Sequence, residues 1–179
     1  KIHSLIEKTK SNGPGTRFGV WFQGCSILCD GCYNPKTHSS KNGNIYLVKD
    51  LSNYITSVEN IEGVTISGGE PFDQPTALLE LVKSIKNNSS LGIIVYSGYT
   101  IEQIKNNVKK NLVLRYIDVL IDGKYIENKA ETKYYKGSSN QRLHFISNIL
   151  SSKDFKSSNP VEVIITKENE IITSGFPSV

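Results

Sequence analysis

The chain has 179 residues, of which 37% are apolar and 21% are charged, and its formal net charge is +4 at pH 7. No apolar run approaches the roughly 20 residues that span a bilayer, so the composition is that of a globular protein without a membrane segment. The lysines are spread along the whole sequence, which gives no basic patch of the kind that binds nucleic acid. We expect neither a membrane nor a nucleic-acid partner.

The length predicts a single domain that spans residues 1–179. It is shorter than the roughly 250 residues of a complete eight-fold β/α barrel, so a barrel-like fold would be incomplete. The sequence begins with Lys1 and contains no methionine. We therefore expect that residue 1 is not the natural start of the protein.

The first recognisable element is an aromatic and β-branched stretch at residues 17–22, which predicts a β-strand after the turn cluster at residues 12–16. This strand leads into a loop that holds all three cysteines of the chain, Cys25, Cys29 and Cys32. Their spacing is C-x-x-x-C-x-x-C. The loop continues to about residue 43 and is rich in Gly, Asp, Asn and Pro, which is the composition of a turn region and not of a core.

Three thiolates on one short loop can hold three corners of a cubane iron–sulfur cluster and leave the fourth iron open to a small molecule. A zinc site is the alternative, but it needs a fourth ligand, for which His38 is the only nearby histidine. A disulfide framework is disfavoured, because the cysteine count is odd and the spacings are short. We interpret the loop as a cluster site in a cytoplasmic protein, where thiols stay reduced.

Beyond the loop, predicted helices alternate with short buried strands, as in βαβ units. Apolar residues at helical spacing predict helices at 48–58, 76–87 and 100–110, the last with Thr100 as its N-cap. Buried strands are predicted at 63–67, 92–97 and 116–121. Residues 161–166 and 171–173 predict a terminal β-hairpin.

Each predicted strand ends in glycines or polar residues. In open α/β sheets and barrels, ligands bind beyond the carboxyl ends of the strands. We therefore expect one site at this edge, formed by the cysteine loop and by the three strand ends that follow it. These ends are residues 67–71 (Ser-Gly-Gly-Glu-Pro), 97–99 (Ser-Gly-Tyr) and 122–124 (Asp-Gly-Lys).

In this order the motifs resemble the radical S-adenosylmethionine superfamily and, within it, the small activating proteins of the anaerobic ribonucleotide reductases. The resemblance covers residues 12–142 and leaves 143–179 as a C-terminal extension. It rests on residues 13–15, 25–34, 67–71, 97–99, 118–124 and 137–141.

The resemblance implies an incomplete TIM-like β/α barrel of the radical SAM type. The C-terminal β-hairpin predicted from the residue pattern is a departure from the usual pattern of the family. It also implies a [4Fe–4S] cluster on Cys25, Cys29 and Cys32 that reductively cleaves S-adenosylmethionine to a 5′-deoxyadenosyl radical. That radical would install a glycyl radical on a partner enzyme such as anaerobic ribonucleotide reductase. The electron would come from a donor such as flavodoxin or ferredoxin.

The resemblance implies cofactor-binding residues as well. Gly68 and Gly69 would let the backbone approach the methionine group, and Glu70 would hold the turn or the ammonium group. Asp122 and Lys124 would reach the ribose or the carboxylate, with a surface ion pair as the alternative. The remaining implied residues are Tyr33, Ser67, Ser97 and Asn140; Ser97 and Asn140 have capping as their alternative, and Tyr33 has core packing.

The usual superfamily pattern often has an aromatic residue before the last cysteine, where this chain has Gly31. Tyr33 would then take over the contact with adenine. His3 and His144 lie in no motif, and His38 is close to the cluster loop without being needed by it.

Two other functions remain open at this point. One is a radical S-adenosylmethionine enzyme that modifies a peptide or a small metabolite directly, for which residues 143–179 are the only candidate substrate-binding extension. The other is a zinc or iron–sulfur binding module without catalysis, which would neither bind nor cleave S-adenosylmethionine.

Overall fold

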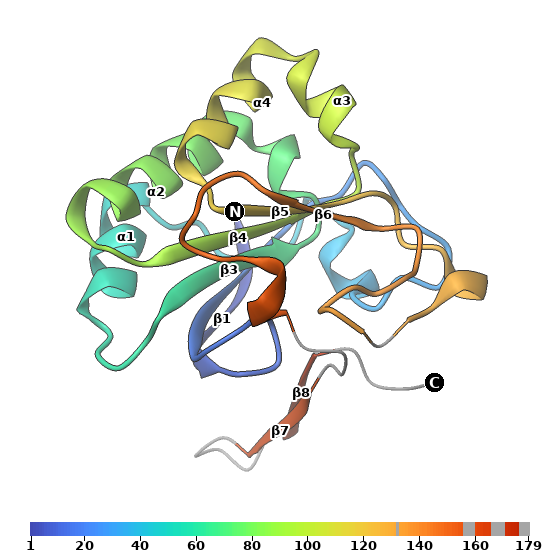
Figure 1. The fold of residues 1–179 in the computed structure, drawn as a ribbon, viewed down its shortest axis with the longest axis horizontal. Helices are drawn as coiled ribbons and strands as arrows, with labels where there is room; N and C mark the ends of the chain where they lie inside the picture. Colours follow the sequence, from blue (N-terminus) through green and yellow to red (C-terminus); the bar gives the residue numbers. More distant parts are fainter. Residues whose placement is uncertain (132, 156–159, 166–170, 176–179) are drawn as a thin grey trace.

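The computed structural model describes residues 1–131, 133–155, 160–165 and 171–175. Its main element is a six-stranded sheet in which the strands lie side by side in chain order, from β1 to β6 (Figure 1). The four inner strands are parallel, and the outer strands β1 and β6 run antiparallel to their neighbours. The strands are β1 Ile2–Thr9, β2 Arg17–Phe22, β3 Gly63–Gly68, β4 Gly92–Ser97, β5 Val119–Asp122 and β6 Arg142–Phe145.

The strand predicted before the cysteine loop and the three predicted after it are the four inner strands of this sheet. The predictions at 17–22 and 92–97 are confirmed to the residue, and the strand predicted at 63–67 extends to Gly68. The prediction of a strand from residue 116 is wrong by three residues, because Leu114–Tyr116 forms a 3₁₀ turn and β5 begins at Val119. β1 and β6 were not predicted.

Helices connect the parallel strands. They are α1 Val48–Ser57, α2 Pro75–Asn88, α3 Ile101–Lys105 and α4 Val108–Val113. The first two predicted helices are confirmed. The single helix predicted at 100–110 is wrong, because the Asn107 side chain accepts a hydrogen bond from the backbone N–H of Lys110 and so caps a new helix. Thr100 is confirmed as an N-cap, in a capping box with Gln103.

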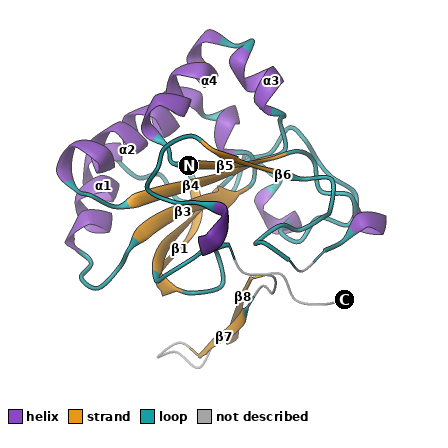
Figure 2. Ribbon diagram, in the orientation of Figure 1, coloured by secondary structure: helices purple, strands orange, loops and turns teal. Residues whose placement is uncertain are grey.

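The helices lie together on one face of the sheet (Figure 2). Side chains alternate between the two faces of a strand, so Ile93 and Val95 pack against the helices while Ile94 packs on the opposite face. The predicted stripe of α2 is completely buried in the helix-side core: Leu78, Leu81, Val82 and Ile85. On the opposite face, Ile94 and Ile121 lie in a smaller cluster that includes Phe155 from the C-terminal segment.

The predicted terminal hairpin is confirmed as a separate two-stranded sheet of β7 Val161–Ile165 and β8 Ile171–Gly175. Its predicted turn at 167–170, and residue 166 of its first predicted strand, lie outside the described residues. The hairpin contacts the start of the chain, where Glu162 accepts a hydrogen bond from the backbone nitrogen of Lys10 at 3.0 Å.

The fold is thus a mixed α/β sheet with a C-terminal hairpin, and the sheet ends at β1 and β6 instead of closing into a full barrel. In the described parts of the chain, no helix is long and apolar enough to cross a bilayer.

Register brings the carboxyl ends of the parallel strands together. Phe22 is paired with Gly68, and Ser97 is paired with Asp122. The segments that follow β2, β3, β4 and β5 therefore start at one edge of the sheet, where the sequence predicts the site.

Candidate metal centre and cofactor site

The cysteine loop leaves β2 and is closed at its base by its own backbone. The N–H groups of Gly24 and Cys25 donate to the carbonyl oxygens of Thr37 and His38, at 2.8 and 3.1 Å. Thr37 ends the short 3₁₀ turn Pro35–Thr37. The residues from 26 to 36 thus form a closed loop that projects from the end of β2, and all three cysteines lie in it or at its base.

All three cysteines are free thiols, partly buried, and they line one cavity. The same cavity is lined by the end of β3, by the end of β4 and by the segment after β5. Of the predicted site residues it includes Cys25, Cys29, Cys32, Tyr33, Ser67, Gly68, Gly69, Glu70 and Ser97. The residues predicted from three separate motifs are therefore brought together at one place.

The donor set fits an iron–sulfur cluster. Burial raises the pKa of the Cys25 and Cys32 thiols, which favours their neutral form until a metal replaces the proton. Within the described residues, no three His, Cys, Asp or Glu side chains are close enough together to hold a single metal ion. A cubane cluster takes one thiolate on each of three irons, so the cysteines need to line a shared cavity.

The two glycines at the end of β3, Gly68 and Gly69, are required by their backbone neighbours. A Cβ on Gly69 would lie 2.2 Å from the carbonyl oxygen of Gly24, and Gly68 has a φ of +104° with a Cβ position 2.4 Å from the nitrogen of Phe22. Both positions therefore need glycine. This close approach lets Glu70 N–H donate to the Gly24 carbonyl at 2.9 Å and fixes the turn to the base of the cysteine loop.

Glu70 holds the turn, which is one of the two roles that the resemblance implies for it. Its carboxylate is buried and accepts hydrogen bonds from the backbone nitrogen of Phe72, at 2.9 Å, and from Ser97 Oγ, at 3.0 Å. It also accepts one from the backbone nitrogen of Gly98, at 2.7 Å. Burial outweighs these hydrogen bonds and raises the Glu70 pKa to about 7. The side chain therefore links the ends of β3 and β4 within the cavity wall.

Asp73 is a positioning residue that the sequence did not reveal. Its carboxylate accepts hydrogen bonds from Ser26, at 2.7 Å from the backbone nitrogen and 3.0 Å from the hydroxyl. The Tyr99 hydroxyl donates to the same carboxylate at 2.8 Å. Asp73 thus fixes the first cysteine turn to the segments after β3 and β4. Its place two residues after the Glu-Pro pair was the only available signal.

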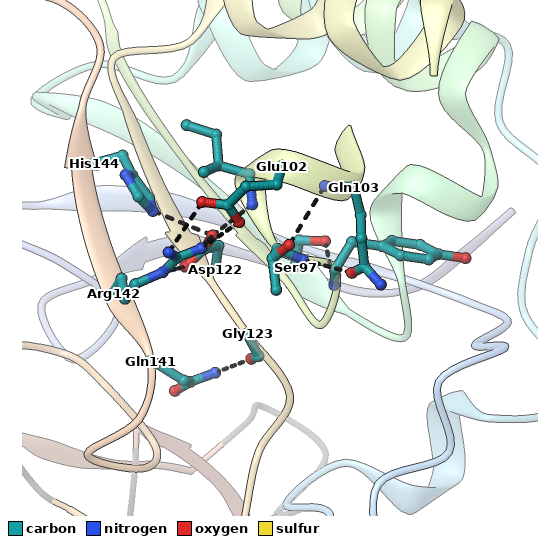
Figure 3. A network of polar contacts seen from close by, with 11 residues as sticks. Ser97, Glu102, Gln103, Asp122, Gly123, Gln141, Arg142 and His144 are labelled. Carbon is teal, nitrogen blue, oxygen red and sulfur yellow. Dashed lines mark hydrogen bonds and ion pairs between the residues drawn. The ribbon is translucent and has the colours of Figure 1, made fainter. Parts of the chain in front are cut away.

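Asp122 lies at the end of β5, but it is not among the residues that line the cavity. Its buried carboxylate accepts hydrogen bonds from Arg142, at 3.0 Å from Nε and 2.6 Å from Nη2. Figure 3 shows that Arg142 also reaches Glu102, and that His144 points at Asp122 from the same strand. The Arg142 guanidinium lowers the pKa of Glu102 to about 2. Asp122 therefore holds β6 and the start of α3 against β5.

Lys124 and Asn140 also lie outside the lining of this cavity. Lys124 lines a neighbouring cavity, together with Cys29 and Tyr125. Asn140 Nδ2 donates to the carbonyl of Lys124 at 2.8 Å. Asn140 Oδ1 is buried and has no hydrogen-bond partner among the described residues.

Two residues that the sequence reading missed complete the cavity wall. Tyr125 packs against Tyr33 with ring centroids 4.8 Å apart and an interplanar angle of 56°, and burial together with a hydrogen bond to Tyr33 raises the Tyr125 pKa to about 12. Gln141 donates to the carbonyl of Gly123 at 2.9 Å (Figure 3) and accepts from the nitrogen of Gly137 at 2.8 Å. The tyrosine pair and Gln141 thus line the same cavity as the Gly-Gly-Glu turn.

Comparison with known proteins agrees with this geometry. Residues 11–144 match the family model of the 4Fe–4S single cluster domain, so the class of the protein is that of a single-cluster iron–sulfur domain. The anaerobic ribonucleoside-triphosphate reductase-activating protein of enterobacteria phage T4 is 37% identical over 138 residues, which cover 74% of this chain and 85% of the relative.

Proteins of the same name from two bacteria are also similar. That of Vibrio cholerae is 34% identical over 141 residues, which cover 74% of this chain and 90% of the relative. That of Escherichia coli K12 is 32% identical over 146 residues, which cover 75% of this chain and 92% of the relative. The chain therefore belongs to the family of anaerobic ribonucleoside-triphosphate reductase-activating proteins.

Proposed function

We propose that this protein is a radical S-adenosylmethionine enzyme that installs a glycyl radical on an anaerobic ribonucleotide reductase. The observation that carries the proposal is that three cysteines and the Gly-Gly-Glu turn, from separate strand ends, line one cavity. The relatives are named for activation of that reductase. This favours the activase over direct modification of a metabolite and over a module without catalysis.

When bound, a [4Fe–4S] cluster supplies one electron to the sulfonium of S-adenosylmethionine and so releases a 5′-deoxyadenosyl radical that abstracts a hydrogen atom. Cys25, Cys29 and Cys32 would hold three of its irons, which leaves the fourth to the amino and carboxylate groups of the methionine part. The protein binds and orients the cofactor and keeps water away from it.

Different residues of the cavity lining would bind different parts of S-adenosylmethionine. Ser67, Gly68 and Gly69 present backbone and a hydroxyl to the methionine part, and the buried Glu70 keeps that turn in place. Tyr33, packed against Tyr125, offers an aromatic surface to adenine. Ser97 is tied to Glu70, and its hydroxyl faces the same cavity.

The other three predicted residues, Asp122, Lys124 and Asn140, would act from outside the lining of the cavity. Asp122 holds the strand from which Gly123 enters the cavity lining. Asn140 donates a hydrogen bond to the carbonyl of Lys124 and would hold that segment in place beside the cavity. Lys124 would approach the cofactor from the neighbouring cavity.

The six-stranded sheet is then a partial barrel of the radical SAM type, and its open side leaves room for a loop of the partner enzyme. The electron donor would be a small redox protein such as flavodoxin or ferredoxin, and the reaction would take place in the cytoplasm.

The direct test is anaerobic reconstitution, followed by iron, sulfide and zinc analysis and by assay of S-adenosylmethionine cleavage. We expect four irons and four sulfides per chain, and methionine and 5′-deoxyadenosine as products. Replacement of Cys25, Cys29 or Cys32 by Ala should abolish cleavage. A single bound zinc without sulfide, or cleavage at the parental rate by Cys29→Ala, would overturn the proposal.

A further inference from the structure

His38 carries a buried polar atom without a partner. Its Nε2 is inaccessible to solvent and has no hydrogen-bond partner among the described residues. Buried ring nitrogens in native structures normally pair with a protein group, with water or with a ligand. A group that completes the site is therefore expected next to this atom.

The backbone fixes where this imidazole stands. The carbonyl oxygen of His38 accepts the hydrogen bond from Cys25 N–H at 3.1 Å, and His38 N–H donates to Pro35 at 3.2 Å. His38 lines the cluster cavity together with the three cysteines, and it also lines an adjoining cavity that, among the cysteines, only Cys25 reaches. The ring thus lies on the Cys25 side of the cluster position.

His38 is also chemically distinct within the cavity. Among the described residues that line it, His38 is the only one whose side chain can carry a positive charge. The cluster with three thiolates is anionic, and it becomes more so when it accepts an electron. A nitrogen donor on this side would meet an excess of negative charge.

We propose that His38 Nε2–H donates a hydrogen bond to a sulfur at the Cys25 corner of the iron–sulfur cluster. This inference rests on the proposed function. Backbone N–H groups already donate to the cysteine sulfurs, those of Ile27 and Leu28 to Cys25 and that of Asn34 to Cys32 at 3.3 Å. Hydrogen bonds to cluster sulfurs raise the reduction potential, because they stabilise the more negative reduced state. His38 therefore eases the uptake of the electron.

The experiment is a potentiometric titration of the reconstituted cluster in the absence of S-adenosylmethionine. Electron paramagnetic resonance measures the fraction of reduced cluster at each potential. His38→Leu removes the donor and should lower the midpoint potential, so that the ratio of reduced to oxidised cluster falls about tenfold at a fixed potential, or about 59 mV for one electron. His38→Gln keeps an N–H donor and should stay closer to the parent. His144→Leu removes a histidine outside the cavity lining and should leave the potential unchanged.

A second measurement uses the unmodified sequence and is independent of variant folding. Protein labelled with ¹⁵N-histidine should show a weak nitrogen coupling to the reduced cluster in pulsed electron paramagnetic resonance. No coupling, or an unchanged potential in His38→Leu with four irons present, overturns the inference and leaves the proposed function intact. A shift that appears only when S-adenosylmethionine is bound would also overturn it, since His38 would then contact the cofactor. Failure of every variant and of the parent to assemble a cluster would instead contradict the proposed function.

Discussion

The carboxylate of Glu70 lies 2.7 Å from the backbone nitrogen of Gly98, so the turn after β3 holds the first residue beyond β4. The same carboxylate bonds Ser97 within β4 and Phe72 within its own turn. The Glu70 backbone nitrogen meanwhile donates to Gly24 at the base of the cysteine loop. One buried side chain and its backbone thus join the three segments that form the cavity.

The stability of the cluster-free protein should depend on the protonation of Glu70. Its pKa is raised from 4.5 to about 7 by burial, so folding favours the protonated form. The resulting stability is fully present below about pH 4.5 and is lost as the pH rises through 7. A shift of this size corresponds to about 3 kcal/mol at most.

Glu70→Gln removes this titration and should flatten the dependence of the free energy of unfolding on pH between about pH 5 and 7. Urea unfolding of the reduced, cluster-free chain measures it. Glu80→Gln, an exposed change on α2, is the matched control and should keep the parental slope. Equal slopes for Glu70→Gln and the parent would refute the effect.

Gly69→Ala should disrupt the site. The new Cβ would meet the Gly24 carbonyl at 2.2 Å, and backbone cannot move aside as the end of a flexible side chain can. We expect a loss of about 1–3 kcal/mol in the free energy of unfolding together with a reduced iron content after reconstitution.

Gly92→Ala is the control for this prediction, because it changes a glycine in the same sheet. The nearest atom to its Cβ position is Ile149 Cγ2 at 3.4 Å, which is a side-chain contact. Iron content and chemical denaturation should stay near the parental values. If both variants behave alike, the close approach of the Gly-Gly-Glu turn to the cysteine loop is not what requires glycine.

Arg142→Ala should destabilise the protein, because it leaves the buried Asp122 carboxylate without its two guanidinium hydrogen bonds. We expect a loss of about 1–3 kcal/mol, measured by chemical denaturation. Asp122→Asn in the same background removes the charge and should recover part of the loss. Arg115→Ala removes an exposed guanidinium and should stay within about 0.5 kcal/mol of the parent. Full additivity of the Arg142 and Asp122 changes would contradict the coupling.

The parallel part of the sheet could be predicted from the sequence because its strands are short apolar runs bounded by glycines and separated by amphipathic helices. The outer strands gave no such signal. β1 pairs with β2 through two register shifts, between Ile2 and Ser4 and between Ile6 and Thr9, so its alternation is interrupted. β6 has only four residues, and two of them, Arg142 and His144, face Asp122. Both are strands through pairing with a distant neighbour, which local sequence does not encode.

The site shows the same limit. Motifs with fixed spacing, such as the cysteines and the Gly-Gly-Glu turn, place their residues in the cavity because each follows directly on a strand end. Three further residues belong to the site only through contacts with residues distant in sequence. These contacts are Asp73 with Ser26, Tyr125 with Tyr33, and Gln141 with Gly123. Asp122 is the last residue of a strand, but its carboxylate is bound by Arg142 from β6, a strand that the sequence did not reveal.

The central claim is tested most directly by glycyl radical formation on the partner. The reconstituted and reduced protein would be mixed anaerobically with S-adenosylmethionine and the anaerobic ribonucleotide reductase of the same organism, and a Cys32→Ala sample would serve as the control. We predict a glycyl radical signal in electron paramagnetic resonance with the parent protein and none with the control. A parent protein that cleaves S-adenosylmethionine but gives no glycyl radical on the reductase would contradict the account.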